Sequence, residues 1–249
     1  MKKYYSLASN GTEADIYIFG DIVDPISQEL WGLESDTSGL SLANDVKDLD
    51  VGVINVHINS YGGSVSEGLA IHSTLRNHKA KVRTICDGFA CSAASVVFMA
   101  GDERIMNNAS LLMIHNAWMV TAGNAGQLRK DADDLEIISK AAAKAYAEHV
   151  NISEEALAAL LDAETWILPE DALEMGFATS IVGAEQTNKA AASAHKALFS
   201  LLKSAIKMNG DVSEDPEPEP EPEPEQDPAP EPKENKTIKF LSALIGGKE

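Results

Sequence analysis

The chain has 249 residues, enough for one full α/β domain with a sizeable core. Its formal net charge is −19, and binding to nucleic acid or to an anionic membrane requires clustered Lys and Arg, so we expect neither partner. The charge is uneven, because residues 211–234 carry eleven acids and one lysine and leave a net charge of −9 for the remainder.

The composition favours a protein of a reducing compartment. No stretch reaches the roughly 18 apolar residues of a membrane span, and no apolar signal segment follows the first residues. Cys86 and Cys91 are the only cysteines, and both lie in or beside an apolar run. This pattern favours buried thiols over a disulfide framework, with a Cys91 nucleophile as the alternative. We therefore expect a cytoplasmic protein.

Strand and helix patterns alternate along the first 115 residues. Runs rich in β-branched and apolar residues predict strands at residues 16–20, 51–58, 82–86, 104–106 and 110–115. Helices are expected at residues 42–49, 64–77 and 93–100. The second of these begins with Ser64 and Glu67 at the spacing of a capping box. This alternation predicts βαβ units and a mainly parallel sheet.

A long amphipathic helix is predicted over residues 125–150. Apolar side chains recur there at steps of three and four, and the other face is charged. A helix of this length is expected to pack against more than its own domain. Two shorter helices follow at residues 153–161 and 169–175, and the latter has Pro169 at its start and Gly176 after its end.

The pattern loosens beyond residue 183. Residues 186–210 form a candidate helical extension. Residues 211–234 form a spacer in which Glu and Pro alternate over residues 215–231, which predicts a disordered and solvated segment. Residues 235–249 turn apolar again, as a docking tail or a frayed terminus would. The sequence thus predicts a folded domain over residues 1–185 followed by these three segments.

Three separated segments carry groups that could act together. Ser92 follows a predicted strand, opens a helix and lies among small residues, as a nucleophile on a sharp turn would. Gly62 and Gly63 end another strand, where they can expose backbone N–H groups. His115 ends a third strand, and strand ends of open α/β sheets gather at one crevice. Taken singly, these features also fit a packed helix, a tight turn and a structural histidine.

Together these segments resemble the ClpP family of serine peptidases. The resemblance spans residues 15–182 and is carried, in order, by residues 59–65, 84–92 and 113–115. It implies a ClpP/crotonase-like fold of stacked βαβ units with a long handle helix. It also implies a ring-forming homo-oligomer that acts on protein or peptide substrates.

The resemblance assigns roles residue by residue. Ser92 would be the nucleophile, and His115 would take its proton and return it to the leaving amine. The backbone N–H groups of Gly63 and Ala93 would form the oxyanion hole. We expect no cofactor and no metal, because the sequence has no P-loop and no His/Cys cluster with zinc spacing.

The third member of the triad is where the sequence departs from the family pattern. The aspartate position of the family falls on Glu164, and Asp162 is the nearby alternative. A glutamate can orient a histidine if its extra methylene is accommodated. Either carboxylate could equally be a solvated group at a helix end.

The residues around this site are most similar to the phage-encoded head maturation proteases of the family. His115 is followed by Asn116-Ala117-Trp118, and the Glu/Pro spacer would suit a flexible arm. This implies capsid and scaffold proteins as substrates, in the host cytoplasm or the immature capsid. The alternatives are a bacterial housekeeping ClpP subunit working with an ATP-driven unfoldase, a crotonase-like acyl-CoA enzyme, and a catalytically inactive assembly protein.

Overall fold

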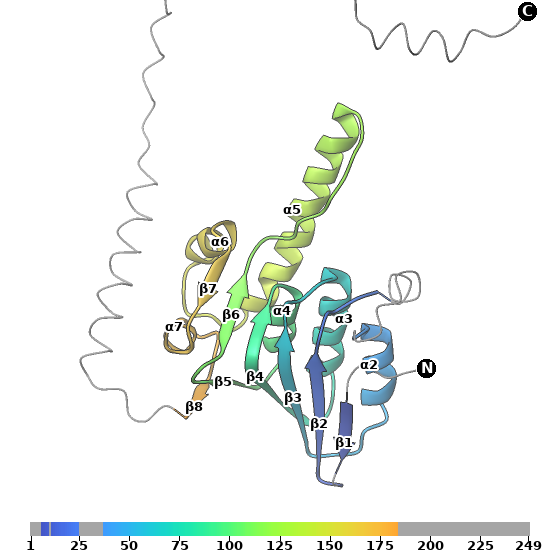
Figure 1. The fold of residues 1–249 in the computed structure, drawn as a ribbon, viewed down its shortest axis with the longest axis vertical. Coiled ribbons are helices and arrows are strands. Elements are labelled where there is room, and N and C mark those ends of the chain that lie inside the picture. Colours follow the sequence, from blue (N-terminus) through green and yellow to red (C-terminus); the bar gives the residue numbers. More distant parts are fainter. Residues whose placement is uncertain (1–5, 10, 25–36, 184–249) are drawn as a thin grey trace, which may run out of the picture. The chain divides into compact units, whose positions relative to one another are not determined.

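The computed structural model of the protein describes residues 6–9, 11–24 and 37–183 (Figure 1). The predicted helical extension, Glu/Pro spacer and apolar tail lie outside the described residues. The described part is a twisted sheet with helices on one face and one long projecting helix. The predicted α/β class with a mainly parallel sheet and a handle helix is confirmed.

The sheet is parallel except at two pairings. Its main path runs in the order β1-β2-β3-β4-β5-β8, and only β1 and β2 on that path are antiparallel. The members of this path are β1 (Ser6–Ser9), β2 (Glu13–Phe19), β3 (Val53–Ser60), β4 (Lys81–Cys91), β5 (Glu103–Asn107) and β8 (Ser180–Val182).

Strand β4 is shared between two neighbours, and this division positions the site. Its first half pairs with β5, from Arg83 to Cys86. Its last residues, Phe89 to Cys91, pair in parallel with β6 (Leu111–Ile114). Strand β6 in turn pairs antiparallel with β7 (Thr165–Ile167). The carboxyl end of β4 is therefore flanked by β3 on one side and by β6 on the other.

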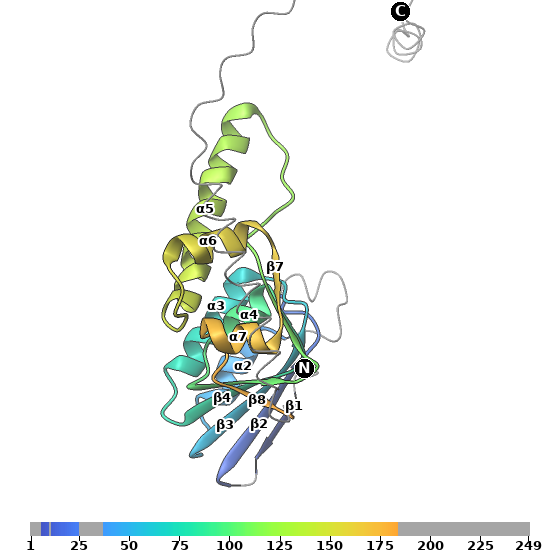
Figure 2. The ribbon, with the colours of Figure 1, turned by 90° about the vertical axis from the view of Figure 1, so that its left-hand side faces the viewer.

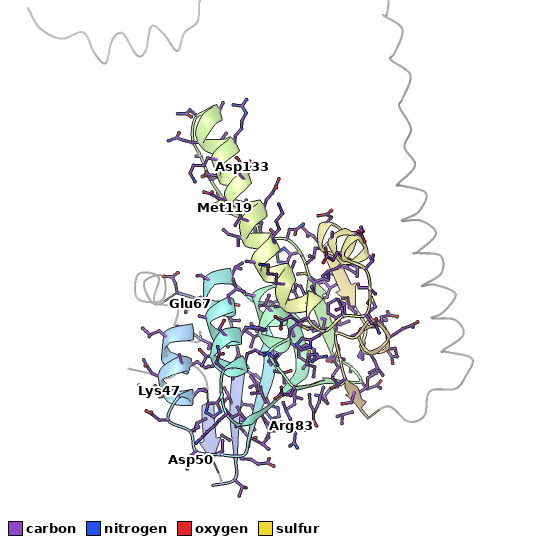
Figure 3. All side chains as sticks on the ribbon, turned by 180° about the vertical axis from the view of Figure 1, so that it is seen from behind. Lys47, Asp50, Glu67, Arg83, Met119 and Asp133 are labelled. Carbon is purple, nitrogen blue, oxygen red and sulfur yellow. The ribbon has the colours of Figure 1, made fainter. Side chains whose placement is uncertain are left out.

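Three helices cover one face of the sheet, as the opposed views of Figures 1 and 3 show: α2 (Gly39–Val46), α3 (Val65–Arg76) and α4 (Ala93–Phe98). Alternate residues of β2 and β3 are fully buried against these helices. Asn55 and His57 alternate with these buried residues and are partly buried on the other face.

The predicted capping box at α3 is only half formed. The Ser64 side chain accepts from the Glu67 N–H, as expected. The Glu67 carboxylate, however, accepts from the N–H of Gly39 at 2.6 Å, at the start of α2. The reason is that the Ser64 N–H already donates to the carbonyl of Ile22. Glu67 therefore links two helices.

Helix α5 (Ala125–Ala147) projects from the body of the domain (Figures 1 and 2). Asn124 and Gln127 form a complete capping box at its start. Only Ala145 and Tyr146 of this helix are buried, near its end. Met119 and Asp133 lie out along the projecting part (Figure 3). Most of α5 is thus exposed or only partly buried within the described part of the chain.

Two short helices complete the domain, α6 (Glu154–Asp162) and α7 (Pro169–Met175). Helix α7 has Pro at its first turn and ends at Gly176 with φ of 85°, where a left-handed residue closes the helix. Within the described residues, no helix combines the length and apolar character needed to cross a bilayer.

Candidate active site

Ser92 lies on a sharp turn between β4 and α4. Its φ is 54° and its ψ is −125°, a conformation that residues with a Cβ rarely adopt and that costs on the order of 1–3 kcal/mol. The Ser92 N–H donates to the carbonyl of Met113 on β6 at 2.8 Å. The Ser92 carbonyl accepts from the N–H of Ser95 at 2.9 Å. Hydrogen bonds on both sides therefore hold the strained residue in place.

Glycine is required where the β3–α3 turn approaches this serine. A Cβ on Gly62 would lie 2.5 Å from the carbonyl oxygen of Cys91 and 2.8 Å from the Cβ of Ser92. The φ of Gly62 is 98°, which also favours glycine. The β3–α3 turn and the turn at Ser92, which the sequence analysis placed in one site, therefore lie in direct contact.

His115 directly follows β6, and its imidazole faces the serine. Its Nε2 lies 2.7 Å from the Ser92 Oγ. This is hydrogen-bond distance for a nucleophile and its general base. The parallel pairing of β4 with β6 brings the two residues together, because it sets the ends of both strands side by side.

Two backbone donors lie beside the pair. The N–H groups of Gly63 and Ala93 have no hydrogen-bond acceptor among the described residues. In contrast, the N–H groups of Gly62 and Ser64 donate to the Ser60 hydroxyl and the Ile22 carbonyl. Gly63 and Ala93 are therefore free to donate to a developing oxyanion.

These groups share one cavity of about 740 Å³. Its wall includes Gly63, Ser92, Ala93 and His115, and also Glu164. Tyr61 and Trp118 lie on the same wall and are largely exposed, so the cavity has aromatic surface available to a ligand.

The two candidate carboxylates differ in position. Glu164 is exposed on the wall of this cavity and forms no hydrogen bond with His115 in the described structure. Asp162 does not line the cavity, and its carboxylate accepts from the side-chain amide of Asn116 at 2.6 Å. Of the two, only Glu164 shares a wall with Ser92 and His115.

The thiol alternative is disfavoured by electrostatics. Burial raises the pKa of the Cys91 thiol to about 11 and that of Cys86 to about 12. A thiolate is the reactive form, and both thiols stay protonated near neutral pH. The serine hydroxyl is the nucleophile candidate that already has a base in contact.

Two polar residues that the sequence analysis did not single out as functional lie behind Ser92. Ser95 on α4 and Tyr146 on α5 are both buried, and their hydroxyl oxygens are 2.8 Å apart. A serine within a small-residue helix and a tyrosine on an apolar stripe give no sequence signal that they meet.

The fold and the site define a class of protein: an α/β domain with a serine–histidine pair and two free backbone donors at its strand ends, as in serine hydrolases. The family model described as Clp protease matches residues 40–185. The match covers more than half of the chain, and the chain therefore belongs to the Clp protease family.

Individual relatives agree with this assignment. An ATP-dependent Clp protease proteolytic subunit from Deinococcus radiodurans is 33% identical over 138 residues, covering 55% of this chain and 68% of the relative. Another, from Borreliella afzelii, is 30% identical over 176 residues and is covered to 83%, against 68% of this chain. A ClpP1 mutant from Listeria monocytogenes shares the fold, with a TM-score of 0.56 and 22% identity over 69% of this chain and 92% of that chain.

Proposed function

We propose that this chain is a serine endopeptidase that uses Ser92 and His115. The observation that carries the proposal is the 2.7 Å contact between the Ser92 Oγ and the His115 Nε2, on the wall of a cavity that also holds two free N–H groups. Membership of the Clp protease family supports the same reaction class.

The proposed reaction is acyl transfer through the Ser92 hydroxyl. The Ser92 Oγ attacks the carbonyl carbon of the scissile peptide bond while the His115 Nε2 takes the hydroxyl proton. The N–H groups of Gly63 and Ala93 donate to the resulting oxyanion, and removal of one such donor costs on the order of a hundredfold in rate. His115 then protonates the leaving amine, and a water molecule activated by His115 hydrolyses the acyl-enzyme.

We assign the third position to Glu164. Its carboxylate stands on the same wall as the imidazole, whereas Asp162 does not line the cavity and accepts a hydrogen bond from Asn116. A carboxylate that approaches the His115 Nδ1 fixes the tautomer and stabilises the imidazolium that forms during attack.

We further propose that the working form is a ring-forming homo-oligomer. The projecting part of α5 and the segment beside it expose large apolar residues that have no partner within the described chain. Trp118 is 72% exposed, Val120 is 88% exposed and Ile137 is 65% exposed. Apolar surface of this kind is typical of subunit interfaces.

The proposed biological setting is the maturation of a phage head, with capsid and scaffold proteins as substrates. Its support is the sequence after His115 and the acidic spacer over residues 211–234. The main alternative is a proteolytic subunit that works with an ATP-driven unfoldase, and its support is that the named relatives are ATP-dependent Clp protease proteolytic subunits. Digestion of folded substrates that depends on an added unfoldase would favour the alternative.

Peptide hydrolysis by matched variants tests the proposal. Ser92→Ala and His115→Ala should each lower kcat/KM for a short fluorogenic peptide by roughly a thousandfold or more, with folding and assembly unchanged. Ser73→Ala removes an exposed hydroxyl from α3 and serves as the control, with activity within about twofold of the wild type. A wild type that folds and assembles without hydrolysing any peptide would support an inactive assembly protein instead. Turnover of an acyl-CoA would support the crotonase-like alternative.

A further inference from the structure

A chain of hydrogen bonds connects the long helix to the backbone of the candidate nucleophile. The Oγ of Ser95 lies 2.6 Å from the carbonyl oxygen of Ser92 and 2.8 Å from the Tyr146 hydroxyl. Ser95 is 1% exposed and Tyr146 is 2% exposed, so water does not compete for these groups. Tyr146 belongs to the only buried part of α5.

Counting protons shows which group donates in each of these hydrogen bonds. A carbonyl can only accept, so the single proton of the Ser95 hydroxyl is donated to Ser92. The Tyr146 hydroxyl must therefore donate to the Ser95 Oγ. Burial raises the pKa of Tyr146 to about 12, so the phenol keeps its proton at every pH at which an imidazole can act as a base.

These hydrogen bonds act on Ser92, the residue of the turn with the strained backbone. The Ser92 N–H is fastened to Met113 on β6, and the Ser92 carbonyl is fastened by the N–H and the hydroxyl of Ser95. A residue with φ of 54° keeps that conformation only while its surroundings oppose relaxation. Rotation of the Ser92 backbone would carry the Oγ away from the His115 Nε2.

We propose that Ser95 and Tyr146 are positioning residues that hold the Ser92 hydroxyl in line with His115. Because Tyr146 belongs to α5, the position of the Ser92 hydroxyl then depends on how α5 packs against the domain. The inference rests on the proposed peptidase function and adds two residues to it that do not touch the reacting atoms.

Rates of labelling by a fluorophosphonate test the positioning role. The variants are Tyr146→Phe, Ser95→Ala and the double variant, measured on the full chain well below its unfolding temperature. Loss of one buried hydrogen bond should lower the maximal labelling rate by about tenfold, while the reagent concentration for half-maximal rate stays within about twofold. Tyr17→Phe, which removes a phenolic hydroxyl from β2, is the matched control and should label at the wild-type rate.

The double variant separates positioning from a general structural effect. Because Tyr146 acts only through Ser95, the double variant should be no slower than Ser95→Ala alone. Wild-type rates in both single variants would overturn the inference. Effects that multiply in the double variant, together with a lower unfolding temperature or a lost oligomer, would also overturn it. A folded wild type that is not labelled at all would instead overturn the proposed function, and the positioning role with it.

Discussion

Ser92 and Glu164 are the two residues other than glycine that have positive φ in the described part of the chain, at 54° and 48°. Both lie where a helix meets a strand, but they are held differently. Ser92 is fastened through its N–H, its carbonyl and its side chain. Glu164 has its N–H bonded to the carbonyl of Leu161 at 3.2 Å, and its side chain is exposed.

The difference shows which members of the candidate triad are held in place by contacts within a single chain. The proposed nucleophile, its proposed base and the two free N–H groups are held by pairing between β4 and β6 and by contact with the β3–α3 turn. The Glu164 carboxylate stands on the cavity wall, between the end of α6 and the start of β7, and its side chain forms no hydrogen bond with any of the described residues. Left-handed backbone is thus held by tertiary contacts at Ser92, whereas at Glu164 it is a local helix ending.

Outside the Ser92–His115 pair, the largest effect is expected from adding one methyl group at Gly62. Its Cβ would meet the backbone of Cys91 and Ser92, so Gly62→Ala should lower kcat/KM by about a hundredfold or more. Gly11→Ala is the control, because φ is similar there (90° against 98°) and a Cβ meets nothing within 4 Å. Equal activity in the two variants would mean that close approach to the nucleophile is not required.

A smaller effect is expected at the carboxylate. Glu164→Gln keeps the size of the side chain and removes its charge, so it should lower kcat by roughly 10- to 100-fold. Asp162→Asn should stay within a few-fold of the wild type, since the Asp162 bond to Asn116 is exposed. Steady-state kinetics on both variants decides the assignment, and Glu164→Gln turnover within a few-fold of the wild type would show that it is wrong.

The smallest effect concerns stability. Glycine adopts positive φ without a Cβ penalty, so Ser92→Gly and Glu164→Gly should each raise the free energy of unfolding by up to about 1 kcal/mol. Urea denaturation measures this, with Ser92→Ala as the control that loses the hydroxyl and keeps the Cβ. If Ser92→Gly proved no more stable than Ser92→Ala, the turn would not be strained.

Much of the fold could be predicted from sequence because its longer elements carry clear periodicity. Three strands were missed, namely β1, β7 and β8, and the last two have only three residues each. Runs this short show no alternation, and their pairing with β6 and β5 creates them. Strand β4 also continues past the predicted end at residue 86 to Cys91, because β6 pairs with its last residues.

The candidate site shows the same division. Small residues and strand ends were enough to nominate Ser92, His115 and the Gly62-Gly63 turn, whereas the donor roles of Gly63 and Ala93 came from the resemblance to the ClpP family. Sequence spacing could not choose between Glu164 and Asp162, because only the three-dimensional course of the chain after α6 decides which side chain reaches the cavity. Nor could it pair residues 95 and 146, which are 51 positions apart in the chain.

The most direct measurement is intact-mass and peptide-mapping mass spectrometry of the wild type and Ser92→Ala after treatment with a fluorophosphonate. A serine hydroxyl within hydrogen-bond distance of an imidazole should give one adduct per wild-type chain, mapped to Ser92, and none in the variant. A folded wild type that gains no adduct, or an adduct that persists in Ser92→Ala, would contradict the assignment of Ser92.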